Sequence, residues 1–238
     1  HGARPWDDDA LSGTVAAYLA AGARSGLSVR TLNRRLSAIR AERRDAGRAG
    51  PGGPAFDPVW AGIRRRHGRP ARKKRALVAA ELKRAVKACP DTLAGVRDRA
   101  ILLVGFAAAL RRSELAALEL DAPGAGPARL AFVGQGMEIS LDRSKADQEG
   151  RGAMIAVPHG TRGLCPVAAT ERWLRAAAIV EGPVFRPVNR GGRVGAAAIT
   201  GRTVAEVVKA AAGRVGLPAE AISGHSLRAG LVTSALEN

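Results

Sequence analysis

The segment 64–75 constrains the fold most, because eight of its twelve residues are arginine or lysine and it also contains Gly68 and Pro70. No hydrophobic core can absorb a segment of this charge, and glycine and proline end a helix that enters it. We therefore expect a basic linker between two separately packed domains. The predicted boundaries are an N-terminal domain at 1–70, a linker at 71–75 and a larger domain at 76–238.

The charge of the chain predicts a polyanionic partner. Lysine and arginine number 38 against 21 acidic residues, a net charge of +17, and residues 1–75 alone hold 17 basic residues against 6 acidic ones. Such an excess is typical of nucleic-acid binding. An anionic membrane surface ranks lower, because only 3% of the residues are aromatic and no amphipathic aromatic helix stands out.

The cysteines and the apolar runs predict the cellular compartment in which the protein is found. Two cysteines, Cys89 and Cys165, are too few for a disulfide framework and have no metal-ligand spacing around them. The longest apolar run, 100–110, is too short to span a bilayer, and no signal peptide precedes the first charged residues. These features predict a cytoplasmic, nucleoid-associated protein with no membrane partner.

Apolar residues at helical spacing predict an all-helical N-terminal domain. The first helix has its apolar face at Leu11, Val15, Tyr18 and Leu19, and we expect Tyr18 to be a core residue. Ser28 is the expected N-cap of a second helix. The core face of that helix is Val29, Leu32, Leu36 and Ile39.

The other faces of the second helix carry six arginines and a single acid, Glu42. A run of charges is usually only a solvated face, but arginines this dense repel one another unless an anion lies against them. We therefore favour contact with a DNA backbone. The predicted DNA-binding residues are Arg30, Arg34, Arg35, Arg43, Arg44, Arg65, Arg72, Lys73 and Lys74.

The larger domain reads as mainly helical with one small sheet. Helices are predicted over 81–89, 93–110, 113–120, 166–179 and 203–214. Between 129 and 157 the apolar period changes to that of strands, which predicts a small antiparallel sheet with turns near 134–136 and 147–152. The fold class is therefore mainly α, in two domains.

Three motifs in this domain carry the chemistry. Arg111 follows a nearly uncharged run, so its guanidinium emerges at the edge of a buried layer and needs a partner such as Glu114 or Glu119. Lys145 lies in a turn between two strands, and lysine, unlike arginine, can release its proton. An exposed loop lysine is the plainer explanation. A helix beginning near His225 places His225 and Arg228 on one face, although a lone His-x-x-Arg is common by chance.

Taken in order, Leu-Arg-Arg-Ser-Glu-Leu at 110–115, the lysine of 144–150 and His-Ser-Leu-Arg at 225–228 resemble the tyrosine recombinase (phage integrase) family. Residues 31–39 resemble a helix of its SAM-like core-binding domain. The resemblance implies a two-domain clamp on duplex DNA. It also implies catalytic roles for Arg111, Lys145, His225 and Arg228, with Glu114 orienting its neighbours.

The resemblance implies a mechanism as well. A tyrosine attacks a DNA phosphate, gives a 3′-phosphotyrosyl link and a free 5′-hydroxyl, and needs neither metal nor cofactor. The enzyme works as a homotetramer on synapsed DNA. Two departures are present: Ala109 stands where the family often has glycine, and no nucleophilic tyrosine follows Arg228. The catalytic domain is therefore expected to be incomplete at its C-terminus, and these 238 residues to bind DNA without cutting it.

Other functions are open at this point. The chain could be a non-catalytic DNA-binding protein or a decayed integrase that keeps the motifs as relics. A type IB topoisomerase-like enzyme shares the catalytic residues. A metal-dependent nuclease could use the acids Asp142, Asp147 and Glu149, although acids in a turn are more often solvated.

Overall fold

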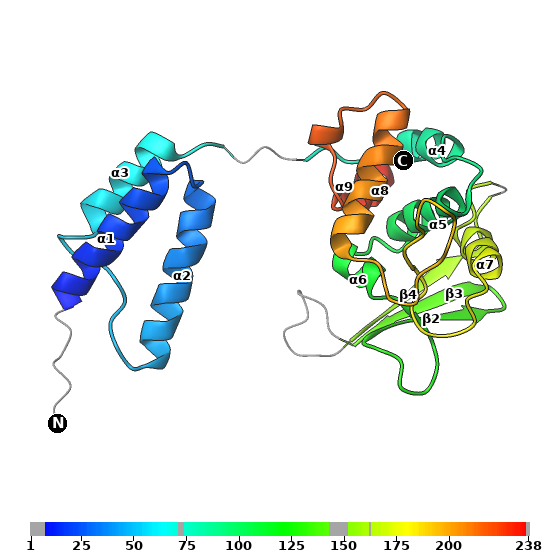
Figure 1. The fold of residues 1–238 in the computed structure, drawn as a ribbon, viewed down its shortest axis with the longest axis horizontal. Helices are drawn as coiled ribbons and strands as arrows, with labels where there is room; N and C mark the ends of the chain where they lie inside the picture. The colour runs from blue at the N-terminus through cyan, green and yellow to red at the C-terminus, as the bar shows by residue number, and fades with distance from the viewer. Residues whose placement is uncertain (1–7, 71–73, 143–151, 162, 237–238) are drawn as a thin grey trace. The chain divides into compact units, whose positions relative to one another are not determined.

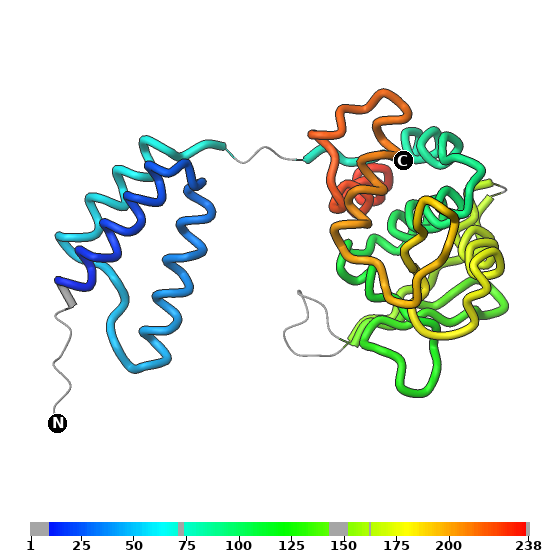
Figure 2. Tube along the Cα trace, viewed as in Figure 1, coloured from blue at the N-terminus to red at the C-terminus, as the bar shows by residue number. Residues whose placement is uncertain are grey.

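The computed structural model describes residues 8–70, 74–142, 152–161 and 163–236, the side chains of residues 8 and 9 excepted. The chain divides into two compact units, His1–Arg72 and Lys73–Asn238, called here the N-terminal unit and the C-terminal unit. Figure 1 shows their helices and strands, and Figure 2 follows the Cα trace through each unit. No helix within the described ranges is long and apolar enough to cross a membrane.

The N-terminal unit is a bundle of three helices, α1 (Asp8–Arg24), α2 (Val29–Asp45) and α3 (Asp57–His67). Ser28 caps α2 as predicted, since its hydroxyl accepts the Thr31 N–H at 3.1 Å. Each helix turns an apolar stripe inward, as the periodicity predicted for the first two helices. The buried core is Val15, Ala16, Leu19, Ala23, Leu32, Leu36, Phe56, Trp60 and Ile63.

The prediction that Tyr18 belongs to this core is wrong. Its side chain is 45% exposed, because the inward stripe of α1 runs through Val15 and Leu19 and leaves Tyr18 at its edge. There the hydroxyl accepts a hydrogen bond from Arg35 Nη1 at 2.9 Å. The guanidinium carbon of Arg35 also lies 5.7 Å from the ring centroid. Tyr18 thus joins α1 to the arginine-rich face of α2.

The C-terminal unit packs helices around α5 (Leu93–Ala107), most of whose residues are buried. Contacts join α5 to α7 (Pro166–Ala176), α9 (Ser226–Leu236), α4 (Ala79–Lys87), α6 (Arg112–Ala116) and α8 (Gly201–Arg214). A short 3-10 turn, η1 (Ala219–Ala221), connects α8 to the segment before α9. Figure 1 shows the sheet on one side of α5 and helices α8 and α9 on the other.

The sheet has four strands in the order β1-β2-β3-β4. β2 (Ala128–Val133), β3 (Gly136–Leu141) and β4 (Ala153–Pro158) pair antiparallel, as the alternating pattern predicted. β1 (Glu119–Leu120) pairs parallel with β2, so the sheet is mixed rather than purely antiparallel.

The predicted helix over 113–120 is too long, because α6 ends at Ala116. The next residues pair with a distant segment instead. Leu118 O accepts the Val184 N–H at 2.8 Å, and the Leu120 N–H donates to Gly182 O at 2.9 Å. These tertiary partners take the backbone groups that a longer helix would have used.

Helix α9 is held in place by the segment that precedes α4. The Leu77 N–H donates to Ser226 O at 2.9 Å, and the Ala79 N–H donates to Ser234 Oγ at 3.0 Å. A Cβ built on Gly230 would lie 1.9 Å from Leu77 O, so only glycine allows this approach. The face of α9 that carries the third motif is therefore rigidly positioned.

Candidate active site

Arg111 is the N-cap residue of α6 and is fixed by Glu114. Its Nη1 donates to Glu114 Oε1 at 2.6 Å, and its backbone N–H donates to Glu114 Oε2 at 2.8 Å. Both side chains are largely buried, with 23% and 12% of their surface exposed. Of the two partners the sequence offered, the structure selects Glu114, while Glu119 accepts the Gly126 N–H.

Arg228 connects the third motif to the first. Its Nη1 donates to the carbonyl oxygen of Ala109 at 3.3 Å, two residues before Arg111. Ala109 adopts φ +48°, the left-handed region that favours glycine. Glycine adopts this conformation without strain, which gives a physical reason for the glycine that the family often has where this chain has Ala109. Segments 119 residues apart in sequence are thereby brought side by side.

His225 stands directly before α9, and its side chain is exposed. Its backbone is tied down, because the His225 N–H donates to Ser223 Oγ at 3.2 Å and the Ser223 N–H donates to Ser226 Oγ at 2.9 Å. Within the described residues the imidazole makes no hydrogen bond. The ring is therefore available to a ligand beside Arg228.

The site so assembled is cationic. Arg111, Arg112 and Arg228 belong to segments in contact, and in the described part of the chain the acid Glu114 is bonded to Arg111. Forked guanidiniums suit an anion with several oxygens, such as a phosphate. Lys145, the remaining predicted catalytic residue, lies outside the described residues, as do Asp147 and Glu149.

Asp142 has a structural partner. Arg129 Nη2 and Nη1 donate to its two carboxylate oxygens at 2.6 and 2.9 Å. These hydrogen bonds, more than the charge itself, lower the pKa of Asp142 below its ordinary value. Among the described residues, no group of three or more His, Cys, Asp or Glu side chains gathers where a metal ion could be held.

The predicted DNA-binding residues of the N-terminal unit fall into two groups. Arg30, Arg34, Arg44 and Arg65 are exposed and have no side-chain hydrogen bond within the described ranges. Arg35 is bonded to Tyr18, and Arg43 Nε donates to Ala49 O at 2.9 Å. Arg72 and Lys73 are outside the described residues. Lys74, in the C-terminal unit, donates to Glu220 O.

One basic hollow was missed by sequence reasoning. A cavity of about 510 Å³ lies between the start of α2 and the end of α3, with Arg30, Arg66, His67 and Arg69 in its lining. Arg66, His67 and Arg69 were not predicted as binding residues. Their adjacency to α2 depends on how the helices pack, although the basic run at 64–75 was a usable signal.

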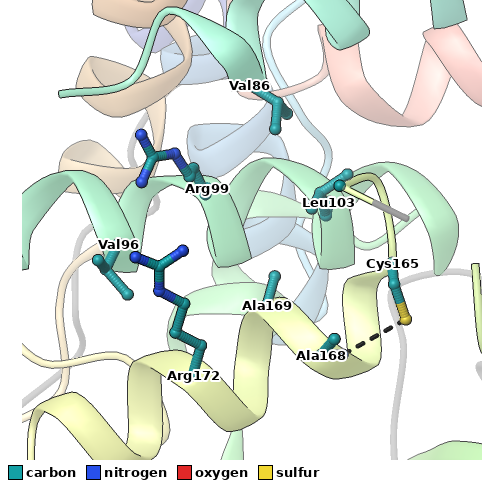
Figure 3. Close-up of a pocket in the computed structure, with 9 residues that line it drawn as sticks. Val86, Val96, Arg99, Leu103, Cys165, Ala168, Ala169 and Arg172 are labelled. Carbon is teal, nitrogen blue, oxygen red and sulfur yellow. Dashed lines mark hydrogen bonds between the residues drawn. The ribbon is translucent and has the colours of Figure 1, made fainter. Parts of the chain in front are cut away.

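A second cavity, of about 230 Å³, lies between α4, α5 and α7. Figure 3 shows the guanidinium groups of Arg99 and Arg172 at its edge and apolar side chains such as Leu103 within it. Cys165 Sγ, also in the lining, accepts the Ala168 N–H at 3.4 Å. This cavity shares no residue with the candidate active site.

A curated relative is similar to most of this chain. The chain is 35% identical over 214 residues to an integrase/recombinase XerD homolog of Selenomonas ruminantium. This similarity supports the tyrosine recombinase (phage integrase) family that the motifs predicted. The alignment covers 87% of this chain and 61% of that relative, so the chain spans about three fifths of the length of the curated tyrosine recombinase it matches. No family model matches the chain.

Solved structures agree on the fold. The chain resembles a XerH site-specific recombinase bound to palindromic difH substrate in a post-cleavage complex, with a TM-score of 0.57, 16% identity, and 98% of this chain and 62% of that chain covered. For a pre-cleavage complex of XerH with difH the TM-score is 0.51 and the identity is 16%. That match covers 98% of this chain and 60% of the XerH chain. The predicted mainly α fold of the tyrosine recombinase family is confirmed, with the mixed sheet as the correction.

Proposed function

We propose that this chain is the DNA-gripping and phosphate-binding part of a site-specific DNA recombinase. It binds duplex DNA, and the whole protein cleaves and rejoins strands through a 3′-phosphotyrosyl intermediate. The observation that carries the proposal is the hydrogen bond from Arg228 to Ala109 O, because it joins the segments that carry the first and third motifs. The XerH complexes with difH support DNA as the partner.

The residues divide the work as follows. Arg111 and Arg228 bind the non-bridging oxygens of the scissile phosphate, where negative charge must be stabilised in the transition state. Glu114 holds the Arg111 side chain and backbone, so the guanidinium is positioned before DNA arrives. His225 donates a hydrogen bond to the same phosphate or moves a proton beside it.

The bond changes balance within the DNA and the protein. A tyrosine oxygen forms a bond to phosphorus as the bond from phosphorus to the 5′-oxygen breaks, and the departing oxygen takes a proton, for which Lys145 is our proposed donor. Tyr18, the single tyrosine of these 238 residues, is not our proposed nucleophile, because it lies in the N-terminal unit and is bonded to Arg35. We therefore expect these residues to bind without cleaving.

The N-terminal unit supplies the grip. The exposed arginines of α2 and the basic hollow beside them are suited to backbone phosphates, which fix register without reading sequence. We propose that the whole protein works as a homotetramer on two synapsed duplexes.

Two measurements test this function. The chain is first used to select its site from a library of randomised duplexes, and the affinity for the selected duplex is then measured over a range of salt concentrations. We expect binding that weakens steeply with salt. The chain is next incubated with a nicked suicide substrate made from that site. No covalent adduct is expected, and one that forms with these 238 residues would contradict the assignment of the nucleophile.

A further inference from the structure

Arg112, the second arginine of the first motif, has no part in the function proposed above. It follows Arg111 and begins α6, and it is exposed. Its aliphatic stem nevertheless lies flat on the protein. A Cβ built on Gly224 would be 3.0 Å from Arg112 Cβ and 3.2 Å from Cδ. The stem therefore runs across Gly224, the residue before His225.

The same stem also contacts the start of α8. A Cβ built on Gly201 would lie 3.4 Å from Arg112 Cγ. Helices α6 and α8 lie side by side in Figure 1, and residue contacts join them. Two glycines from segments distant in the sequence thus make room for one arginine, and a side chain at Gly224 would displace it.

The guanidinium at the end of this stem lacks a counter-charge. Within the described residues it makes no hydrogen bond or ion pair, whereas its neighbour Arg111 is bonded to Glu114. An arginine whose stem is already packed loses less conformational freedom when its head binds an anion. The surface that Arg112 shares with His225 therefore has a cation prepared for a ligand.

We propose that Arg112 binds a DNA phosphate neighbouring the scissile one and so sets the register of the strand in the site. The inference rests on the proposed function, since DNA supplies the phosphate. The Arg111 side chain is turned to Glu114 and the Arg112 stem to Gly224, so the two adjacent arginines serve different phosphates.

The test separates the charge of Arg112 from the packing of its stem. Arg112→Met keeps an unbranched stem on the two glycines and removes the charge, Arg112→Lys keeps both, and Arg175→Met on α7 is a matched control that removes an exposed charge elsewhere. Each protein is titrated with the selected duplex, and with duplexes in which one phosphate at a time is replaced by a neutral methylphosphonate.

We expect Arg112→Met to bind the duplex roughly tenfold more weakly, with an unchanged melting temperature. The slope of log affinity against log salt should fall by about one in this variant and stay the same in Arg112→Lys. One methylphosphonate that weakens the parent chain should no longer weaken Arg112→Met. Arg175→Met should retain the parent's sensitivity at that position.

Other results overturn the proposal. If Arg112→Met binds the duplex as tightly as the parent chain, Arg112 does not bind a phosphate. The same conclusion follows if every methylphosphonate weakens the binding of Arg112→Met by the same factor. If Arg112→Met and Arg112→Lys lose affinity and melting temperature together, the stem has only a packing role. A parent chain that binds no duplex overturns the proposed function itself, which is a separate and recognisable failure.

Discussion

The exposed arginines of α2 and the two arginines of the candidate active site contrast in how they are held. On α2 the guanidiniums of Arg30, Arg34 and Arg44 are exposed and have no side-chain partner among the described residues. In the C-terminal unit Arg111 is held by Glu114, and Arg228 by a backbone carbonyl. Holding a charged duplex requires many cations in roughly the right place, whereas stabilising one phosphate requires a few cations in fixed positions.

The largest effect should come from breaking the support of the fixed group. Gly230→Ala places a Cβ 1.9 Å from Leu77 O, so α9 must move and take His225 and Arg228 with it. We expect a loss of about 3 kcal/mol in the stability of the C-terminal unit. Thermal unfolding and DNA titration measure the two consequences.

The control for that substitution lies in the other unit. A Cβ on Gly13 of α1 meets no atom within 4 Å, so Gly13→Ala should stabilise the N-terminal unit by up to about 1 kcal/mol. If Gly13→Ala and Gly230→Ala change stability by the same amount, the close contact of α9 with Leu77 does not hold this helix in place.

The exposed arginines of α2 should give the next largest effect, on binding alone. Replacing Arg30, Arg34 and Arg44 by glutamine should lower the salt slope by about three and the affinity by about 100-fold, without loss of stability. The comparison variant removes three exposed charges from the C-terminal unit, at Arg84, Arg175 and Arg193. If both variants lose the same affinity, binding follows net charge and the contrast between the units fails.

Relief of backbone strain at the fixed site should give a smaller gain. Ala109 has φ +48°, which costs a residue with a side chain about 1–2 kcal/mol and glycine very little. After the entropy of glycine in the unfolded chain is subtracted, Ala109→Gly should stabilise by about 0.5–1 kcal/mol and leave DNA affinity unchanged.

Ala178, at φ +52° after α7, is the matched position for this test. Ala178→Gly should give a similar gain in chemical denaturation. A destabilised Ala109→Gly beside a stabilised Ala178→Gly would mean that the Ala109 methyl group, and not the left-handed backbone, holds the turn.

The smallest effect concerns acid stability. Arg129 lowers the pKa of Asp142, so this ion pair stabilises the folded chain fully above the unfolded pKa of about 3.9. The contribution is lost as the pH falls through the lower folded pKa. Asp142→Asn should therefore show a shallower fall in melting temperature from pH 4 to pH 2. Because solvent screens this exposed pair, we expect only a modest difference between the two melting-temperature curves. Parallel curves for the parent chain and Asp142→Asn would contradict the prediction.

Local patterns predicted the parts of this structure that local physics determines. Periodic leucines predicted α2, Ser28 predicted its cap, and the uncharged run before Arg111 predicted that this arginine needs a partner. Tyr18 and the end of α6 were misplaced because each depends on a partner far away in sequence, Arg35 for one and Gly182 with Val184 for the other.

In the candidate site, too, local sequence patterns predicted the residues, while contacts between distant segments could not be predicted. Motif order in the sequence indicated which residues belong together, but only packing could show that Arg228 reaches Ala109 O. The roles of Arg40 and Arg43 were equally hidden. Their guanidiniums donate to Pro51 O and Ala49 O, so these two arginines hold a loop as well as face solvent.

The most direct test of the account is a double-mutant cycle on duplex affinity. Arg111→Lys and Arg228→Lys each keep the charge and lose the fork that binds two oxygens. If both arginines hold one phosphate, the double variant should lose clearly less affinity than the two single losses combined, with a coupling above about 0.5 kcal/mol. Losses that simply add, in proteins of unchanged melting temperature, would show that the two arginines act on separate parts of the DNA.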